Sequence, residues 1–160
     1  MTGPLLYVEN DENDIFLFHR ALKRIGFAYR FESVKNGREA LAYLQGSGPY
    51  ANRQQFPLPE LLVLDLKMPE MSGLDVLKWV RLQPAFAALP VLLLSSSTQA
   101  SDIEEARKLG ANAYAVKPGT PLQLEQMLKT IRDDIFAAHQ QRSLWSVPFN
   151  QCASTATAAR

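Results

Sequence analysis

The chain has 160 residues, of which 47% are hydrophobic and 21% charged, and its formal net charge is +1. This composition predicts one soluble globular domain with a substantial core, and the near-neutral charge gives no electrostatic reason to expect binding to nucleic acid or to an anionic membrane. The N-terminus lacks a signal-peptide pattern, no apolar run approaches the roughly 20 residues of a membrane span, and Cys152 is the only cysteine, which together favour a reducing cytoplasm.

Apolar runs and helical patterns alternate along the chain, so the sequence predicts strands and helices in turn. The predicted strands, in chain order, are 5–8, 29–34, 61–65, 89–94 and 113–116. Apolar residues at helical spacing predict a helix after each strand, marked in order by Ile15–Ile25, Ala40–Leu44, Leu74–Val80, Ile103–Leu109 and Leu124–Ile135. Five such alternations indicate an α/β fold with a parallel sheet covered by helices on both faces.

Local signals mark the boundaries of these elements. Asn13 and Asp14 are candidate N-caps for the first helix. The segment 46–59 contains several Gly and Pro residues and is longer than a typical connection, so we expect an exposed loop that is either a tolerated insertion or a partner contact. The helical periodicity of apolar residues ends near residue 142. The chain is therefore divided into a domain over 1–142 and a tail over 143–160 that is poorly ordered or contacts a second subunit.

The third predicted strand ends in Asp65, a residue type that is rare in strands and costly to bury. We therefore expect Asp65 at the carboxyl end of the strand, facing the crevice where open α/β sheets bind ligands. Polar residues also follow three other predicted strands, namely Glu9 with Asn10, Ser95, and Lys117. Each alone is consistent with a turn, a cap or a surface residue, but parallel strands place their carboxyl ends at one edge, so these groups are expected to converge.

Such a cluster has a definite chemistry. Carboxylates that repel one another are tolerated around a hard divalent cation, and Mg²⁺ prefers oxygen ligands of this kind. The Asp65 carboxylate is a candidate nucleophile towards phosphorus, which would give an aspartyl phosphate. Lys117 and Mg²⁺ would neutralise the phosphoryl oxygens, and the Ser95 hydroxyl would donate to one of them.

These residues resemble the receiver domain of two-component response regulators, over a stretch from about Leu5 to about His139. The resemblance rests on four features of this sequence: the pair Glu9-Asn10 after the first strand, Asp65 with Met68-Pro69 and Gly73, a hydroxyl at Ser95 thirty positions after Asp65, and Lys117-Pro118 twenty-two positions further on.

The resemblance implies a flavodoxin-like, doubly wound sheet of five parallel strands in the order 2-1-3-4-5. It also implies that Asp65 is the phosphoacceptor, that Lys117 pairs with the phosphate, and that Ser95 and Tyr114 are the switch residues. The Mg²⁺ ligands that it implies are Glu9, Asn10, Asp65 and the backbone carbonyl of Lys67.

Two residues depart from the family pattern. Asn10 stands where the family usually has an Asp that ligates the metal, so we expect weaker Mg²⁺ binding than the usual pattern gives. Gly119 replaces the usual aromatic residue after Lys-Pro, which is expected to loosen the adjoining loop. The Lys117–Pro118 peptide bond is expected to be cis, as in the family.

No output domain is visible in the sequence, and the long loop is similar to that of small stand-alone regulators, including those paired with bacterial phytochromes. The implied phosphodonor is a sensor histidine kinase, of phytochrome or another type, or a histidine phosphotransfer protein. The readout would then be a partner protein, onward transfer of the phosphate to a histidine, or a homodimer, for which Trp145 and Phe149 are candidate contacts. On this interpretation the chain is a phosphoacceptor in signalling and not a classical enzyme.

Three other functions fit the same architecture less well. A pseudo-receiver would signal by binding without phosphorylation; Asn10 favours this alternative, whereas the intact Asp65, Ser95 and Lys117 oppose it. A phosphatase that forms an aspartyl phosphate would commonly carry a second acid at the position of Lys67. A flavin carrier needs a phosphate-binding loop after the first strand, where the acidic residues of this chain would repel a phosphate.

Overall fold

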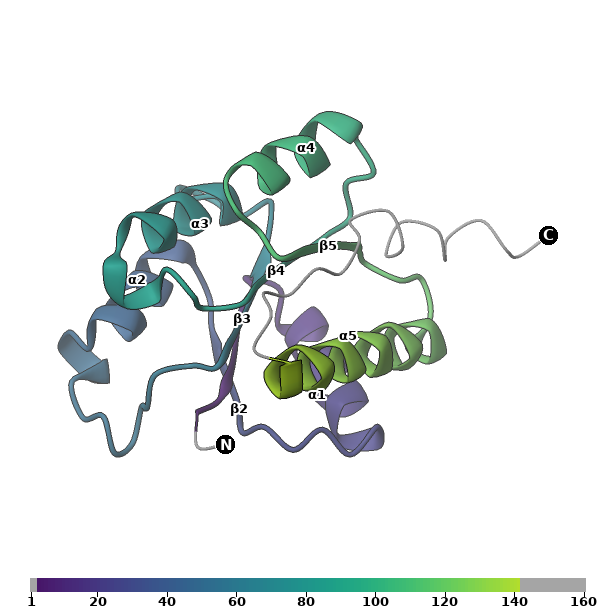
Figure 1. Cartoon of the computed structure of the whole chain (residues 1–160), viewed down its shortest axis with the longest axis horizontal. Helices are drawn as coiled ribbons and strands as arrows, with labels where there is room; N and C mark the ends of the chain where they lie inside the picture. The colour runs from purple at the N-terminus through teal and green to yellow at the C-terminus, as the bar shows by residue number, and fades with distance from the viewer. Residues whose placement is uncertain (1–2, 142–160) are drawn as a thin grey trace.

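The computed structural model describes residues 3–141, in which a parallel sheet lies between two layers of helices (Figure 1). Its strands are β1 (Leu5–Val8), β2 (Phe31–Val34), β3 (Leu61–Asp65), β4 (Val91–Ser95) and β5 (Ala113–Val116). Its helices are α1 (Glu12–Arg24), α2 (Gly37–Gln45), α3 (Gly73–Leu82), α4 (Ala100–Lys108) and α5 (Pro121–Gln141), with short 3₁₀ turns at Gly48–Tyr50 and Pro84–Phe86.

The five strands pair in the order β2-β1-β3-β4-β5, and every pair is parallel, which confirms the predicted topology. Strand β3 is the middle strand of the sheet, and all five of its residues are buried, as expected for a strand covered on both faces. The order changes direction between β1 and β3, and such a switch point opens a crevice at the carboxyl ends of the strands. Asp65, the last residue of β3, therefore lies where the sheet is expected to form a site.

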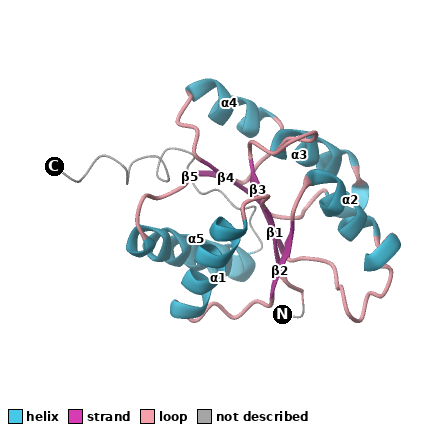
Figure 2. Cartoon of the chain, turned by 180° about the vertical axis from the view of Figure 1, so that it is seen from behind, coloured by secondary structure: helices cyan, strands magenta, loops and turns pink. Residues whose placement is uncertain are grey.

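Alternate residues of each strand supply two separate apolar layers. On one face, residues such as Tyr7, Val63 and Leu94 pack against α1 and α5. On the other face, residues such as Leu6 and Leu64 pack against α2, α3 and α4. Figure 2 shows this division, with α1 and α5 together on one side of the strands and the other three helices opposite.

Two strand boundaries differ from the prediction. Strand β2 begins at Phe31 rather than at residue 29. Tyr29 is buried with its ring tilted against that of Phe27, so it contributes to the apolar pattern although it does not pair with β1. Strand β4 begins at Val91 rather than at residue 89, because Pro90 has no backbone N–H to donate to the ladder. The predicted helix N-caps were also wrong, since Asp11 caps α1: its Oδ1 atom accepts hydrogen bonds from the backbone N–H groups of Asn13 and Asp14.

The long connection before β3 is mostly exposed, as predicted, but it is anchored by one side chain. The Arg53 guanidinium donates to the backbone carbonyls of Tyr43, Leu44 and Phe56, at 2.7, 2.7 and 3.2 Å. Two of these carbonyls belong to the last turn of α2, where carbonyl groups lack the usual helical donor four residues further on. The loop is thus held to the helix that it follows, at the edge of the sheet away from Asp65.

Among residues 3–141, no helix combines the length and the apolar character that crossing a lipid bilayer requires. The tail predicted over 143–160, with Trp145 and Phe149, lies outside the described residues.

Candidate functional site

Side chains from the ends of four strands meet at one edge of the sheet. Asp65 ends β3 and Ser95 ends β4, whereas Glu9 and Lys117 each directly follow a strand, β1 and β5. Glu9 and Ser95 are each 1% exposed and Asp65 is 6% exposed, so all three polar groups are taken out of water. The convergence predicted from the parallel topology is therefore present for Glu9, Asp65 and Lys117, whose side chains are in contact.

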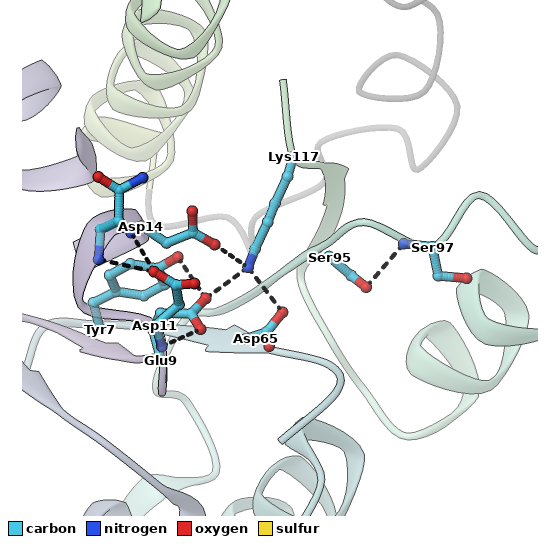
Figure 3. Close-up of polar contacts among 9 residues, drawn as sticks. Tyr7, Glu9, Asp11, Asp14, Asp65, Ser95, Ser97 and Lys117 are labelled. Atoms are coloured by element: carbon cyan, nitrogen blue, oxygen red, sulfur yellow. Dashed lines mark hydrogen bonds and ion pairs between the residues drawn. The ribbon is translucent and has the colours of Figure 1, made fainter. Parts of the chain in front are cut away.

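The ammonium group of Lys117 lies at the centre of three carboxylates. Its Nζ atom is 2.6 Å from Glu9 Oε2, 2.8 Å from Asp14 Oδ2 and 3.3 Å from Asp65 Oδ1. Figure 3 shows Asp14 and Asp65 on different sides of this nitrogen, with the lysine side chain reaching down from the end of β5. Three negative groups around one positive group leave this cluster with a formal charge of −2.

Glu9 is fixed by further hydrogen bonds. Tyr7 Oη donates to Glu9 Oε2 at 3.1 Å, and the backbone N–H of Asp11 donates to Glu9 Oε1 at 3.0 Å. Burial, together with the neighbouring Glu9 carboxylate, raises the pKa of the Tyr7 phenol, which therefore stays protonated and remains a donor. Both oxygens of the Glu9 carboxylate are consequently engaged.

The burial of these groups shifts their protonation equilibria. Burial, reinforced by the charge of Glu9, raises the pKa of the Asp65 carboxyl from 3.8 to about 6, although Lys117 pulls it back down. Burial lowers the pKa of Lys117, but hydrogen bonds from its ammonium to Asp14 and Glu9 outweigh this and leave the pKa above its ordinary value. At neutral pH the lysine is therefore charged and Asp65 is mostly ionised. The positive charge of Lys117 does not fully offset the effect of burial and of Glu9 on the Asp65 carboxylate.

The loop after β3 presents Asp65 through a close backbone approach. The backbone N–H of Gly73 donates to Leu66 O at 3.0 Å, and a Cβ at position 73 would lie 2.2 Å from the carbonyl oxygen of Asp65. Ser72 caps α3 in a capping box with Asp75, which fixes where the helix begins. Only glycine fits at position 73 without moving the end of β3.

A second set of polar contacts connects Ser95 to α4. The Ser95 hydroxyl accepts a hydrogen bond from the backbone N–H of Ser97 at 3.1 Å, and Tyr114 Oη donates to the carbonyl of Ser97 at 2.9 Å. The Ser97 hydroxyl donates to the carboxylate of Asp102, in the first turn of α4. Ser95 and Tyr114, both singled out in the sequence, are thus joined through Ser97, which was not.

The sequence-based expectation of a cis bond at Lys117–Pro118 was wrong. The structure has no cis peptide bond among residues 3–141, so this bond is trans, the form that proline favours by about 0.5–1 kcal/mol. Lys117 nevertheless reaches Asp65 from this backbone.

Asp14 and Tyr7 are the members of the pocket that sequence reasoning did not identify as such. Asp14 was singled out only as a candidate N-cap, and Tyr7 only as a residue of the predicted strand 5–8. The signal that was available for Asp14 is its position in the first turn of the helix that follows β1, directly above the end of that strand.

The donor chemistry at this edge fits a hard divalent cation, although the carboxylates alone do not form a metal cage. Among residues 3–141, no group of three or more His, Cys, Asp or Glu side chains is arranged to hold a metal ion by itself. The predicted ligand set contains two carboxylates, Glu9 and Asp65, with the Asn10 amide and the Lys67 carbonyl, and all of these offer oxygen atoms. The charge of −2 and the raised pKa of Asp65 are the observations that favour an added cation.

Comparisons with known proteins agree with this architecture. The family model described as the response regulator receiver domain matches residues 5–129. The probable methanogenesis regulatory protein FilR2 of Methanothrix harundinacea is 32% identical over 132 residues, which are 81% of this chain and 79% of that protein.

Two solved structures are similar over most of their length. The phosphorylated cyanobacterial phytochrome response regulator RcpA superposes with a TM-score of 0.77 at 32% identity, over 86% of this chain and 96% of that one. The Mn²⁺-bound form of response regulator Rcp1 has a TM-score of 0.73 at 28% identity, over 82% and 92%. With a family match over most of its length and the same sheet topology, this chain belongs to the response regulator receiver domain family.

Proposed function

We propose that the chain accepts a phosphoryl group on Asp65 and that this modification changes its binding to a partner. The observation that carries this proposal is the contact of Lys117 with Asp65 at the buried carboxyl end of β3. In the proposed step an Asp65 carboxylate oxygen attacks the phosphorus of a phosphohistidine. The new O–P bond forms as the P–N bond breaks, and the donor imidazole leaves with the electron pair of that bond.

The residues of the pocket have separate roles in this step. Asp65 must be ionised to attack, and a pKa of about 6 leaves it so at neutral pH. The Lys117 ammonium would pair with a phosphoryl oxygen, and the Ser95 hydroxyl would donate to another. Glu9, fixed by Tyr7 and the Asp11 N–H, would stay hydrogen-bonded to the Lys117 ammonium throughout.

Glu9, Asn10, Asp65 and the Lys67 carbonyl would hold Mg²⁺, for which the neutral Asn10 amide predicts a modest affinity. When bound, the cation supplies positive charge to the phosphoryl oxygens. The structure of the Mn²⁺-bound form of Rcp1 supports a divalent cation in a related protein. Asn10→Asp should therefore tighten Mg²⁺ binding, as measured by isothermal titration calorimetry, and an unchanged affinity would show that Asn10 is not a ligand.

The contacts around Ser97 offer a route from the phosphoryl group to the surface. If Ser95 turns its hydroxyl towards the phosphoryl group, its hydrogen bond from the Ser97 N–H is disturbed. Ser97 also binds Tyr114 and Asp102, so the start of α4 and the Tyr114 ring are expected to respond. The surface formed by α4, β5 and α5 is the one that would change its binding.

The partners follow from the relatives. RcpA is described as a phytochrome response regulator, which supports a histidine kinase, of phytochrome or another type, as phosphodonor here. The same proposal includes a histidine phosphotransfer protein as donor or acceptor, and a homodimer. It also includes the domain boundary at residue 142 and a cytoplasmic location. A pseudo-receiver that is not phosphorylated is the second candidate, favoured by the neutral Asn10.

Intact mass after incubation with acetyl phosphate and Mg²⁺ tests the proposal. Wild type should gain the mass of one phosphoryl group, Asp65→Asn should gain none, and Asp133→Asn, which alters an exposed aspartate on α5, should behave as wild type. No gain in wild type, or an equal gain in Asp65→Asn, would exclude Asp65 as phosphoacceptor and leave the pseudo-receiver.

A further inference from the structure

The Lys117 ammonium is already surrounded by carboxylates before Asp65 is phosphorylated. An ammonium group has three N–H donors, and in this structure it contacts three carboxylates, those of Glu9, Asp14 and Asp65. The contacts with Glu9 and Asp14 are hydrogen bonds of 2.6 and 2.8 Å, whereas the contact with Asp65 is longer, at 3.3 Å. The ammonium is thus held towards Glu9 and Asp14, away from the residue that would be modified.

The two competing carboxylates differ in how readily they can release the lysine. The Glu9 side chain is 1% exposed, so a Glu9 carboxylate without Lys117 would be a buried charge without its counter-ion. The Asp14 side chain is 36% exposed and can be solvated by water when the lysine moves. In addition, the only hydrogen bond of the Asp14 carboxylate among residues 3–141 is the one from Lys117.

We propose that Asp14 is a positioning residue for Lys117, which retains the ammonium while Asp65 is unmodified and releases it to the phosphoryl group. This inference rests on the proposed function. As Lys117 moves towards the phosphoryl oxygens, its bond to Asp14 lengthens and the Asp14 carboxylate becomes hydrated. Asp14 therefore opposes phosphoryl retention twice, by restraining the lysine and by placing a negative charge near the new one (Figure 3).

Removing the charge of Asp14 should consequently favour the phosphoryl-bound state. We expect Asp14→Asn to bind a phosphoryl analogue about three- to tenfold more tightly, the range expected for a partly exposed, charge-assisted hydrogen bond. Asp14→Glu keeps the charge and should restore wild-type behaviour. Glu12→Gln is the matched control, because Glu12 lies in the same turn of α1 but pairs with the exposed Lys35.

The test is a titration of beryllium chloride at fixed fluoride into each full-length protein, with the bound fluoroberyllate measured by ¹⁹F NMR. Two Mg²⁺ concentrations, both saturating, remove any contribution from metal affinity. Half-saturation of Asp14→Asn at a lower beryllium concentration, with Asp14→Glu and Glu12→Gln like wild type, supports the inference. Equal or weaker binding by Asp14→Asn overturns it, including the case in which thermal stability alone changes, since that marks a merely structural ion pair.

Failure of the proposed function has a different signature. If wild type binds no fluoroberyllate, or if Asp65→Asn binds it as well as wild type, Asp65 is not the phosphoacceptor, and the role of Asp14 falls with it. If wild type binds and Asp65→Asn does not, the comparison of Asp14→Asn with wild type decides the inference alone.

Discussion

Replacing Asp65 with Asn tests the electrostatics of the pocket without any phosphodonor. Burial and the nearby Glu9 raise the pKa of Asp65 from 3.8 to about 6, so its ionised form is disfavoured in the folded protein. One pKa unit corresponds to about 1.4 kcal/mol, which gives a ceiling of about 3 kcal/mol at neutral pH. Water at the rim of the pocket screens part of this, so we expect Asp65→Asn to raise the free energy of unfolding by about 1–2 kcal/mol at about pH 7.5.

The sign of the pH dependence follows from the direction of the shift. Because the folded-state pKa lies above the unfolded value, the folded wild type binds more protons between about pH 4 and 6, and its stability falls as pH rises through that window. The advantage of Asp65→Asn should therefore be full above the folded-state pKa and shrink to about a third at about pH 4.5.

Urea unfolding of wild type and variant in EDTA at these two pH values measures the difference. Asp133→Asn removes the charge of an exposed aspartate on α5 and should give no such gain. The reasoning is refuted if Asp65→Asn is less stable than wild type at about pH 7.5, or if the same difference persists at about pH 4.5.

Two further substitutions test the framework of the site by urea unfolding. Gly73→Ala should destabilise the protein by more than about 2 kcal/mol, because the added Cβ would meet the backbone of Asp65. Gly119→Ala is the control and should cost little, because nothing lies within 4 Å of a Cβ added there. Equal effects of the two substitutions would contradict the close approach at Gly73. Tyr7→Phe should cost about 1–2 kcal/mol at neutral pH, because the buried Glu9 carboxylate loses a donor while the ring packing remains, and no change would show that the phenol contributes nothing.

The sheet and its helices could be predicted because the signal is local and strong. Strand β3 is five consecutive buried residues ending in an aspartate, and each crossover helix carries apolar residues at helical spacing. Parallel topology then places all carboxyl ends at one edge, so the meeting of Glu9, Asp65 and Lys117 followed from the order of elements alone.

The details that could not be predicted depend on tertiary contacts. Tyr29 has the same apolar character as a strand residue, and only the pairing with β1, which begins at Phe31, shows that Tyr29 precedes β2. Four residues of the segment 9–14 are Asn or Asp and so are chemically able to cap α1, and backbone geometry alone selects Asp11. Asp14 reaches Lys117 across 103 positions of sequence, a contact for which no local pattern exists.

The balance of charge in the pocket connects these details to the proposed chemistry. Three carboxylates and one ammonium leave a charge of −2 before any phosphoryl group arrives, and phosphorylation of Asp65 would add about one further negative charge. Lys117 cannot neutralise that charge alone, and Asn10, being neutral, keeps the pocket from being more negative still. We therefore expect phosphorylation to depend on a divalent cation that is bound with modest affinity. The extent of phosphorylation would then follow the Mg²⁺ concentration over a wide range rather than saturate at low concentrations.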